Sequence, residues 1–183
     1  MKSYNETWFS FTFELINTYD PFYEEPERIG SVALLTELLS KHGLLSTKLP
    51  ASKDLIAVHS YRDTFRDLIR TATDKELSLF LNTHLSRAPI QSSLSTTTGG
   101  QFMFVYDQPE GKGHSLSDSL LSICSLVLGM ELTEYGRSRL KACASVPCEE
   151  IFIDHSKNGL QRFCSKRCST RYHVKKHRQL GHL

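Results

Sequence analysis

The chain has 183 residues, of which 39% are hydrophobic and 10% aromatic, so it holds enough apolar material for a packed core and is not a disordered chain. No stretch reaches the roughly 18 consecutive apolar residues of a membrane span, and the N-terminus lacks the apolar run of a signal peptide. We therefore expect a cytoplasmic protein with no membrane partner, organised as one ordinary domain followed by a small one.

The charge of the chain is unevenly distributed. The formal net charge is only +2, from 22 basic and 20 acidic residues. From Arg137 onward, eleven Lys and Arg stand against three Asp and Glu, a formal charge of +8. The residues before Arg137 carry the other eleven basic and seventeen acidic side chains, a charge of −6. Such asymmetry indicates a C-terminal segment that binds polyanions.

The first element is expected over residues 8–16. Phe9, Phe11, Phe13 and Leu15 alternate there with Ser10, Thr12 and Glu14, a pattern that predicts a strand with one apolar face. Residues 19–29 are acidic and contain two prolines, which indicates a loop.

Three helices should follow this loop. The first begins at Ser31 and stops at Gly43, the second runs from Ser52 or Lys53 to about Thr71, and the third covers residues 74–86. Each carries leucine, isoleucine or phenylalanine on one face, so together they should build much of the core.

A hairpin and a fourth helix are expected next. Residues 90–97 and 101–107 read as two strands around the turn Thr98-Gly99-Gly100. Large apolar side chains occupy both faces of the second strand, which predicts burial on both sides. An apolar helix from Leu116 to about Met130 should then pack against this sheet.

Four of the five cysteines lie in two close pairs near the C-terminus. Four residues separate Cys143 from Cys148, fifteen more lead to Cys164, and three separate Cys164 from Cys168. Two thiolates from each pair can surround one tetrahedral Zn²⁺ at roughly 2.3 Å each. Because cysteines would occupy all four positions, the zinc is expected to be structural, with no open site for water. The fifth, Cys124, is interpreted as a small buried hydrophobe.

The residues around the second pair predict a hairpin and a helix. Residues 151–154 read as a strand, 156–159 as a turn with Asn-Gly at its tip, and 160–163 as a returning strand. Ser165 is the expected N-cap of a helix over residues 166–179 that Gly181 ends. A metal knuckle, a hairpin and a helix make a treble-clef-like finger. The predicted fold class is therefore α+β, with a mixed helix and antiparallel-strand domain over residues 1–136 and a zinc finger over 137–183.

The finger resembles a known family. The resemblance rests on residues 140–148, 151–154, 156–159 and 162–165 together with Cys168, which look like the CGNR zinc-finger family. At the motif that names the family, this chain has Cys168-Ser169-Thr170-Arg171. It thus keeps the cysteine and the arginine and replaces the middle two residues.

The N-terminal part resembles the domain that precedes this finger in CGNR proteins. Residues 13–18 are similar to the opening strand of the ABATE domain, commonly Leu-Asp-Phe-Val-Asn-Thr. ABATE and CGNR proteins are regarded as stress-induced transcriptional regulators, so the resemblance implies DNA binding and transcription regulation.

The C-terminal helix carries the residues that would contact nucleic acid. Arg167, Arg171, Lys175 and Arg178 recur at intervals of four, four and three, which places them on one helix face. Such a face suits DNA phosphates or a groove edge. The full set of candidate contacts is Lys141, Lys157, Arg162, Lys166, Arg167, Arg171, Lys175, Lys176 and Arg178.

The leading hypothesis is thus a zinc-dependent regulator that binds double-stranded DNA. The alternative is a zinc-stabilised module that binds an acidic protein and no DNA. A small-molecule effector of the N-terminal domain and a homodimer remain open, and nothing in the sequence fixes an interface. We expect no enzyme, because the chain shows no nucleophile elbow, dinucleotide fingerprint or telling pair of carboxylates.

Overall fold

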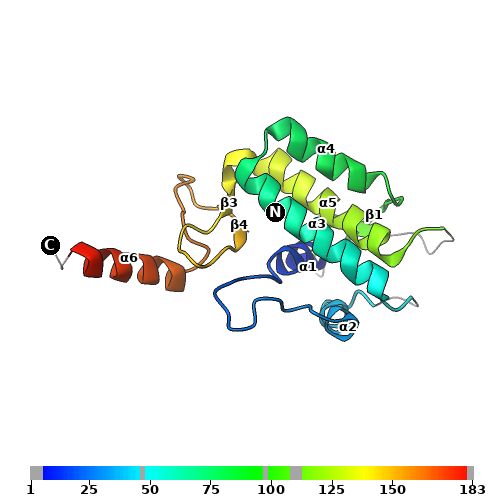
Figure 1. Ribbon diagram of the computed structural model, residues 1–183. Coiled ribbons are helices and arrows are strands. Elements are labelled where there is room, and N and C mark those ends of the chain that lie inside the picture. The colour runs from blue at the N-terminus through cyan, green and yellow to red at the C-terminus, as the bar shows by residue number, and fades with distance from the viewer. Residues whose placement is uncertain (1–5, 46–47, 97–98, 108–112, 181–183) are drawn as a thin grey trace.

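The computed structural model describes residues 6–45, 48–96, 99–107 and 113–180, and within them the fold is α+β as expected (Figure 1). Six α-helices and two two-stranded antiparallel sheets make up this part of the chain. In chain order the elements are α1 (Glu6–Ile16), α2 (Val32–Lys41), α3 (Ser52–Thr71), α4 (Asp74–Leu85), β1 (Gln91–Thr96), β2 (Phe102–Asp107), α5 (Leu116–Tyr135), the 3-10 turn η1 (Arg137–Arg139), β3 (Leu140–Ala142), β4 (Ile151–Ile153) and α6 (Lys166–Leu180).

The strand predicted over residues 8–16 is wrong, because this segment is the helix α1. Its buried side chains are Trp8, Phe11, Thr12, Leu15 and Ile16, which follow the three-and-four spacing of a helix. The phenylalanines that suggested alternation lie on different sides of this helix. Burial against the other helices decides the conformation here, and it overrides the strand preference of aromatic residues.

The three helices that follow are confirmed, and side-chain caps close the starts of two of them. The Ser31 hydroxyl accepts a hydrogen bond from the Leu34 amide at 3.3 Å at the start of α2. At the start of α4, the side chains of Thr73 and Glu76 each accept from the other's amide, at 3.3 and 2.8 Å. These local caps explain why both helix starts could be predicted.

The helix α5 is the centre of the core. It extends to Tyr135, beyond the predicted end at about Met130, and stops where Gly136 takes a φ of 80°. Contrary to the prediction, it packs against α1, α3 and α4 rather than on the β1–β2 sheet. Within the described residues it alone is long and apolar enough to cross a membrane by composition, yet 61% of that stretch is buried inside the protein. Its apolar surface is therefore accounted for as core.

The β1–β2 hairpin is confirmed, but its predicted burial is wrong. Leu94 lies opposite Phe104, and Thr96 opposite Phe102, in the antiparallel register. Phe102 is 70% exposed and Phe104 47% exposed, whereas β2 was expected to be buried on both faces. The helix that should have covered this face packs among the other helices instead. Of the predicted turn, Thr98 lies outside the described residues.

The finger shares the apolar core of the N-terminal helices. Strands β3 and β4 pair antiparallel, with Leu140 opposite Ile153 and Ala142 opposite Ile151. Leu140, Ile151 and Ile153 belong to the same core as Phe11 of α1. The predicted division after residue 136 falls at the end of α5, and one continuous core extends across it.

Candidate metal centre

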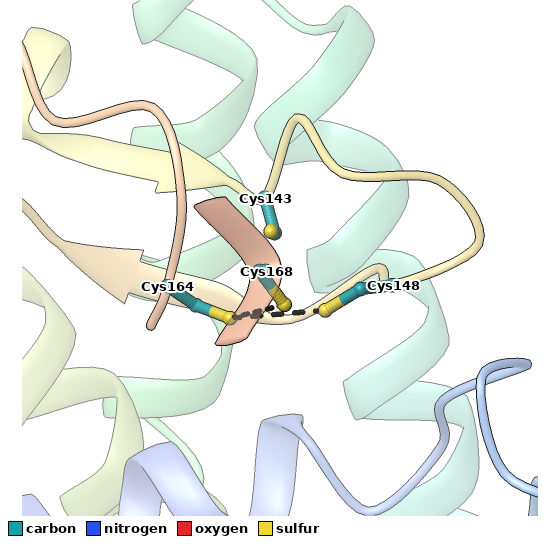
Figure 2. A group of neighbouring side chains, drawn as sticks. All are labelled: Cys143, Cys148, Cys164 and Cys168. Carbon is teal, nitrogen blue, oxygen red and sulfur yellow. Dashed lines mark hydrogen bonds between the residues drawn. The ribbon is translucent and has the colours of Figure 1, made fainter. Parts of the chain in front are cut away.

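The first pair of cysteines is held by a loop between β3 and β4. The Cys143 amide donates to the Glu150 carbonyl at 2.8 Å, and the Cys148 amide donates to the Ser145 carbonyl at 2.9 Å. These bonds turn both side chains toward the same space (Figure 2). The loop is thus a metal knuckle at the end of a short sheet.

The returning strand predicted over residues 160–163 is wrong. β4 takes β3 as its partner, and the Leu160 side chain is 76% exposed. The Arg162 carbonyl instead accepts from the Ala144 amide at 2.9 Å, which brings this segment beside the knuckle. The Ser156–Gly159 turn itself is present, with Gly159 at a φ of 65°.

The second pair lies at the start of α6. Cys164 precedes the helix and Cys168 occupies its first turn, as the spacing predicted. Ser165 caps the helix, because its hydroxyl accepts from the Cys168 amide at 3.3 Å. Both sulfurs therefore face the knuckle, while the predicted stop at Gly181 lies outside the described residues.

The four sulfurs lie at distances that suit one tetrahedral metal ion. All four fall within 4.8 Å of one another, and Sγ of Cys164 is 3.8 Å from that of Cys148 and 3.5 Å from that of Cys168. A Zn–S distance of about 2.3 Å implies sulfurs about 3.8 Å apart at tetrahedral angles. Cys143, Cys148 and Cys168 are buried. The donor set and its geometry fit a structural zinc ion.

Burial disfavours charged thiolates in this cluster unless a cation is bound. Burial raises the pKa of the Cys148 thiol to about 12, and burial together with Glu150 raises the pKa of Cys164 further. Burial opposes ionisation of Cys168 too, but hydrogen bonds from Ser165 and the neighbouring thiols lower its pKa. Four thiolates this close repel one another strongly, and a bound dication removes that repulsion.

Arg171 connects the metal cluster to the rest of the protein. Its guanidinium donates to Sγ of Cys168 at 3.5 Å, to the Ser145 carbonyl at 2.7 Å and to the Ser145 hydroxyl at 3.1 Å. The same group lies 4.3 Å from the ring centre of Phe22, and the guanidinium of Arg167 lies 4.6 Å from that ring. Arg171 thus orients a metal ligand and holds the N-terminal loop through Phe22.

Asn17 fixes the finger to the N-terminal helices. Its side-chain amide donates to the Ile151 carbonyl at 2.9 Å, and its side-chain oxygen accepts from the Ile151 amide at 2.8 Å. Arg66 and Arg70 of α3 pair with Glu149 beside the knuckle, at 3.1 and 3.2 Å. Sequence reasoning missed these contacts, since no local pattern connects residues so far apart. The Asn-Thr that ends the ABATE-like motif was the available signal.

Asp154 organises the turn beyond β4. Its carboxylate is fully buried and accepts from Nζ of Lys141 at 2.7 Å and from the amides of Ser156 and Gln161, each at 2.9 Å. Although burial alone would raise the pKa of Asp154, these hydrogen bonds hold it well below its usual range. Lys141, a predicted DNA contact, is therefore engaged within the finger.

The nine predicted nucleic-acid contacts divide into two groups. Lys141, Arg162, Arg167 and Arg171 contact other parts of the protein, with Arg162 lying over the rings of Phe163 and Tyr172, although Arg162 and Arg167 are exposed as well. The other five side chains are exposed and form no ion pair within the described part of the chain; they are Lys157, Lys166, Lys175, Lys176 and Arg178. Arg171, Lys175 and Arg178 line one open groove on α6, consistent with the shared helix face that their spacing predicted.

The knuckle, the short sheet and the helix that supplies the last ligand define a four-cysteine zinc finger of treble-clef-like form. Residues 139–179 match the family model of the CGNR zinc finger. The match covers the finger and leaves the N-terminal helices outside it. A comparison with curated proteins gives no significant match. The ABATE-like character of residues 1–136 stays a prediction.

Proposed function

We propose that this protein is a DNA-binding transcriptional regulator whose zinc finger presents α6 to duplex DNA. The observation that carries the proposal is the position of this helix. α6 extends away from the helical body, as Figure 1 shows at the left of the view, while its first turn is fixed to the metal cluster through Cys168. A helix held rigidly at one end and open to solvent along its length is well placed to contact DNA.

The charge of this surface supports DNA as the partner. Lys175, Lys176 and Arg178 follow one another on α6, and Lys157 and Lys166 add charge near the cluster. All five are exposed, so their ammonium and guanidinium groups are available to phosphates. Arg171 and Lys141 would contribute indirectly, since they hold the finger together.

The zinc would act by fixing this geometry. Cys143, Cys148, Cys164 and Cys168 would fill its coordination sphere, which leaves no position for a reacting water. This arrangement supports a structural rather than a catalytic role for the zinc ion. A cytoplasmic location, where thiols stay reduced, would keep these four cysteines available as zinc ligands.

Fluorescence anisotropy with mixed-sequence duplex DNA tests the proposal. The double variant Lys175→Gln and Lys176→Gln should weaken binding by roughly tenfold to a hundredfold at moderate salt, because two phosphate contacts are lost. The matched control, Lys53→Gln and Lys75→Gln, changes two exposed lysines of α3 and α4 and should bind as the wild type does. An equal loss of DNA affinity in the two double variants, or no loss in the α6 variant, would exclude α6 as the DNA-contacting element.

An acidic protein partner is the second candidate, since the same five cations would attract it. In that case the wild type would show no affinity for duplex DNA at low salt. Acidic proteins would instead bind α6. The double variant Lys175→Gln and Lys176→Gln would then lose affinity for the protein partner alone.

A further inference from the structure

The β1–β2 hairpin presents an apolar face to solvent. Residues directly opposite in an antiparallel pair share a face, so Leu94 and Phe104 lie together, with Phe102 next to them. These three side chains are 61%, 47% and 70% exposed. Tyr106 stacks on Phe104 at a ring distance of 6.2 Å and continues the face to the base of the hairpin.

The hairpin has little support from the rest of the described structure. Only its base packs on the core, through Ile90 and Tyr106, and every residue of β1 is exposed. An isolated two-stranded hairpin is at best marginally stable in water, and a packed partner on its apolar face stabilises it. Other exposed hydrophobic side chains, such as Ile56 and Leu79, lie on separate helices and do not share one face of a strand pair.

The absence of charge favours a second copy of the chain as the partner. From Ala88 to Tyr106 the sequence contains no Asp, Glu, Lys, Arg or His, in a chain of which 23% is charged. In a two-fold dimer the same patch meets itself, so any charge on it would lie close to its own copy and repel it. An uncharged apolar face avoids this repulsion. It also lacks the lysines that normally protect an exposed strand from self-association.

We propose that this hairpin face, made of Leu94, Phe102, Phe104 and Tyr106, is the interface through which two copies of the chain form a two-fold dimer. The apolar faces of the two hairpins pack on each other, with Phe102 and Phe104 at the centre. The hairpin lies at the opposite end of the molecule from α6 (Figure 1), so the dimer leaves both basic helices uncovered.

The size of the face sets the strength of the dimer. A phenylalanine side chain offers roughly 200 Å², so Phe102 and Phe104 together expose roughly 230 Å² per copy, or about 460 Å² for two copies. Leu94, Tyr106 and the strand backbones add to this area. The total is below the roughly 1,600 Å² of standard stable interfaces and near the range of weak ones. The dimer should therefore be weak and reversible, and it should populate mainly at high protein concentration.

Sedimentation velocity of the full zinc-loaded chain, from about 1 to about 500 μM, tests the dimer. The wild type should shift from 20.8 kDa toward twice that mass as its concentration rises. The double variant Phe102→Ser and Phe104→Ser should raise the dissociation constant at least about tenfold. The matched control, Ile56→Ser and Leu79→Ser, removes side chains that are 68% and 67% exposed and should dimerise as the wild type does.

A wild type that stays at 20.8 kDa throughout would overturn the proposal. An unchanged dissociation constant in the hairpin variant would also overturn it. Hydrogen exchange of the wild type provides a second test that needs no variant. Amides of β1 and β2 should become more protected as concentration rises, and protection independent of concentration would contradict the dimer.

Discussion

Replacing Asn17 with alanine should loosen the finger from the N-terminal helices. The Asn17 side chain is 8% exposed and pairs with both the amide and the carbonyl of Ile151, at 2.8 and 2.9 Å. Because these groups of Ile151 point away from β3, Asn17 occupies the outer edge of β4 much as another strand would. Alanine leaves a buried donor and a buried acceptor without their partner.

The expected loss of unfolding free energy comes from the unpaired amide and carbonyl of Ile151. A buried hydrogen-bonding group that loses its partner costs about 1–3 kcal/mol, so the variant should lose about 2–4 kcal/mol of unfolding free energy. With a urea dependence of about 2 kcal/mol per molar, the unfolding midpoint should fall by about 1–2 M. Asn17→Asp should be at least as damaging, because it places a carboxylate oxygen against the Ile151 carbonyl.

Urea unfolding followed by the fluorescence of Trp8, the single tryptophan and part of the core, measures this change. The control is Asn82→Ala, on the exposed side of α4, where a change within about 0.5 kcal/mol is expected. A loss below about 0.5 kcal/mol in Asn17→Ala would refute the reasoning that this contact holds the finger in place.

Three further predictions concern the metal site and the core. Cys148→Ser should lose the zinc and lower the melting temperature, and metal analysis that still finds one zinc per chain would contradict the ligand set. Arg171→Met should weaken zinc affinity by about tenfold to a hundredfold in a chelator competition, because the guanidinium no longer orients Cys168, whereas Arg178→Met should leave it unchanged. Burial above all lowers the pKa of His84 below 6.5, so protonation favours the unfolded chain and stability should fall as pH decreases from about 6.5 through the folded pKa. His84→Phe should lose less stability over that range, and an equal loss in denaturant titrations would exclude His84 as the cause.

The sequence predicted most reliably what short stretches of chain determine. The starts of α2 and α4 depend on Ser31 and Thr73, each of which caps a helix within three residues. The cysteine spacing likewise reflects local geometry, since a knuckle and one helical turn bring each pair together before any distant contact forms. Such features need no knowledge of how the helices pack.

The wrong predictions concern segments whose conformation or burial depends on contacts with residues far away in the sequence. Residues 8–16 have a strand-like alternation, yet α1 forms because Trp8, Phe11 and Leu15 fill space against α3 and α5. The apolar β2 suggested burial on both faces, but α5 packs among the helices and leaves Phe102 in solvent. The cation–π contact between Arg171 and Phe22 joins segments about 150 residues apart. Sequence spacing does not predict contacts over such a separation.

We propose that zinc-anchored α6 contacts DNA phosphates, and the salt dependence of binding would reveal such contacts. Anisotropy of the zinc-loaded protein with mixed-sequence duplex DNA would be measured at several salt concentrations. Five exposed cations, Lys157, Lys166, Lys175, Lys176 and Arg178, predict a slope of log K against log salt of about −4.5, or about −3 when three of them reach the DNA. No binding at low salt, or a slope near zero, would contradict the claim.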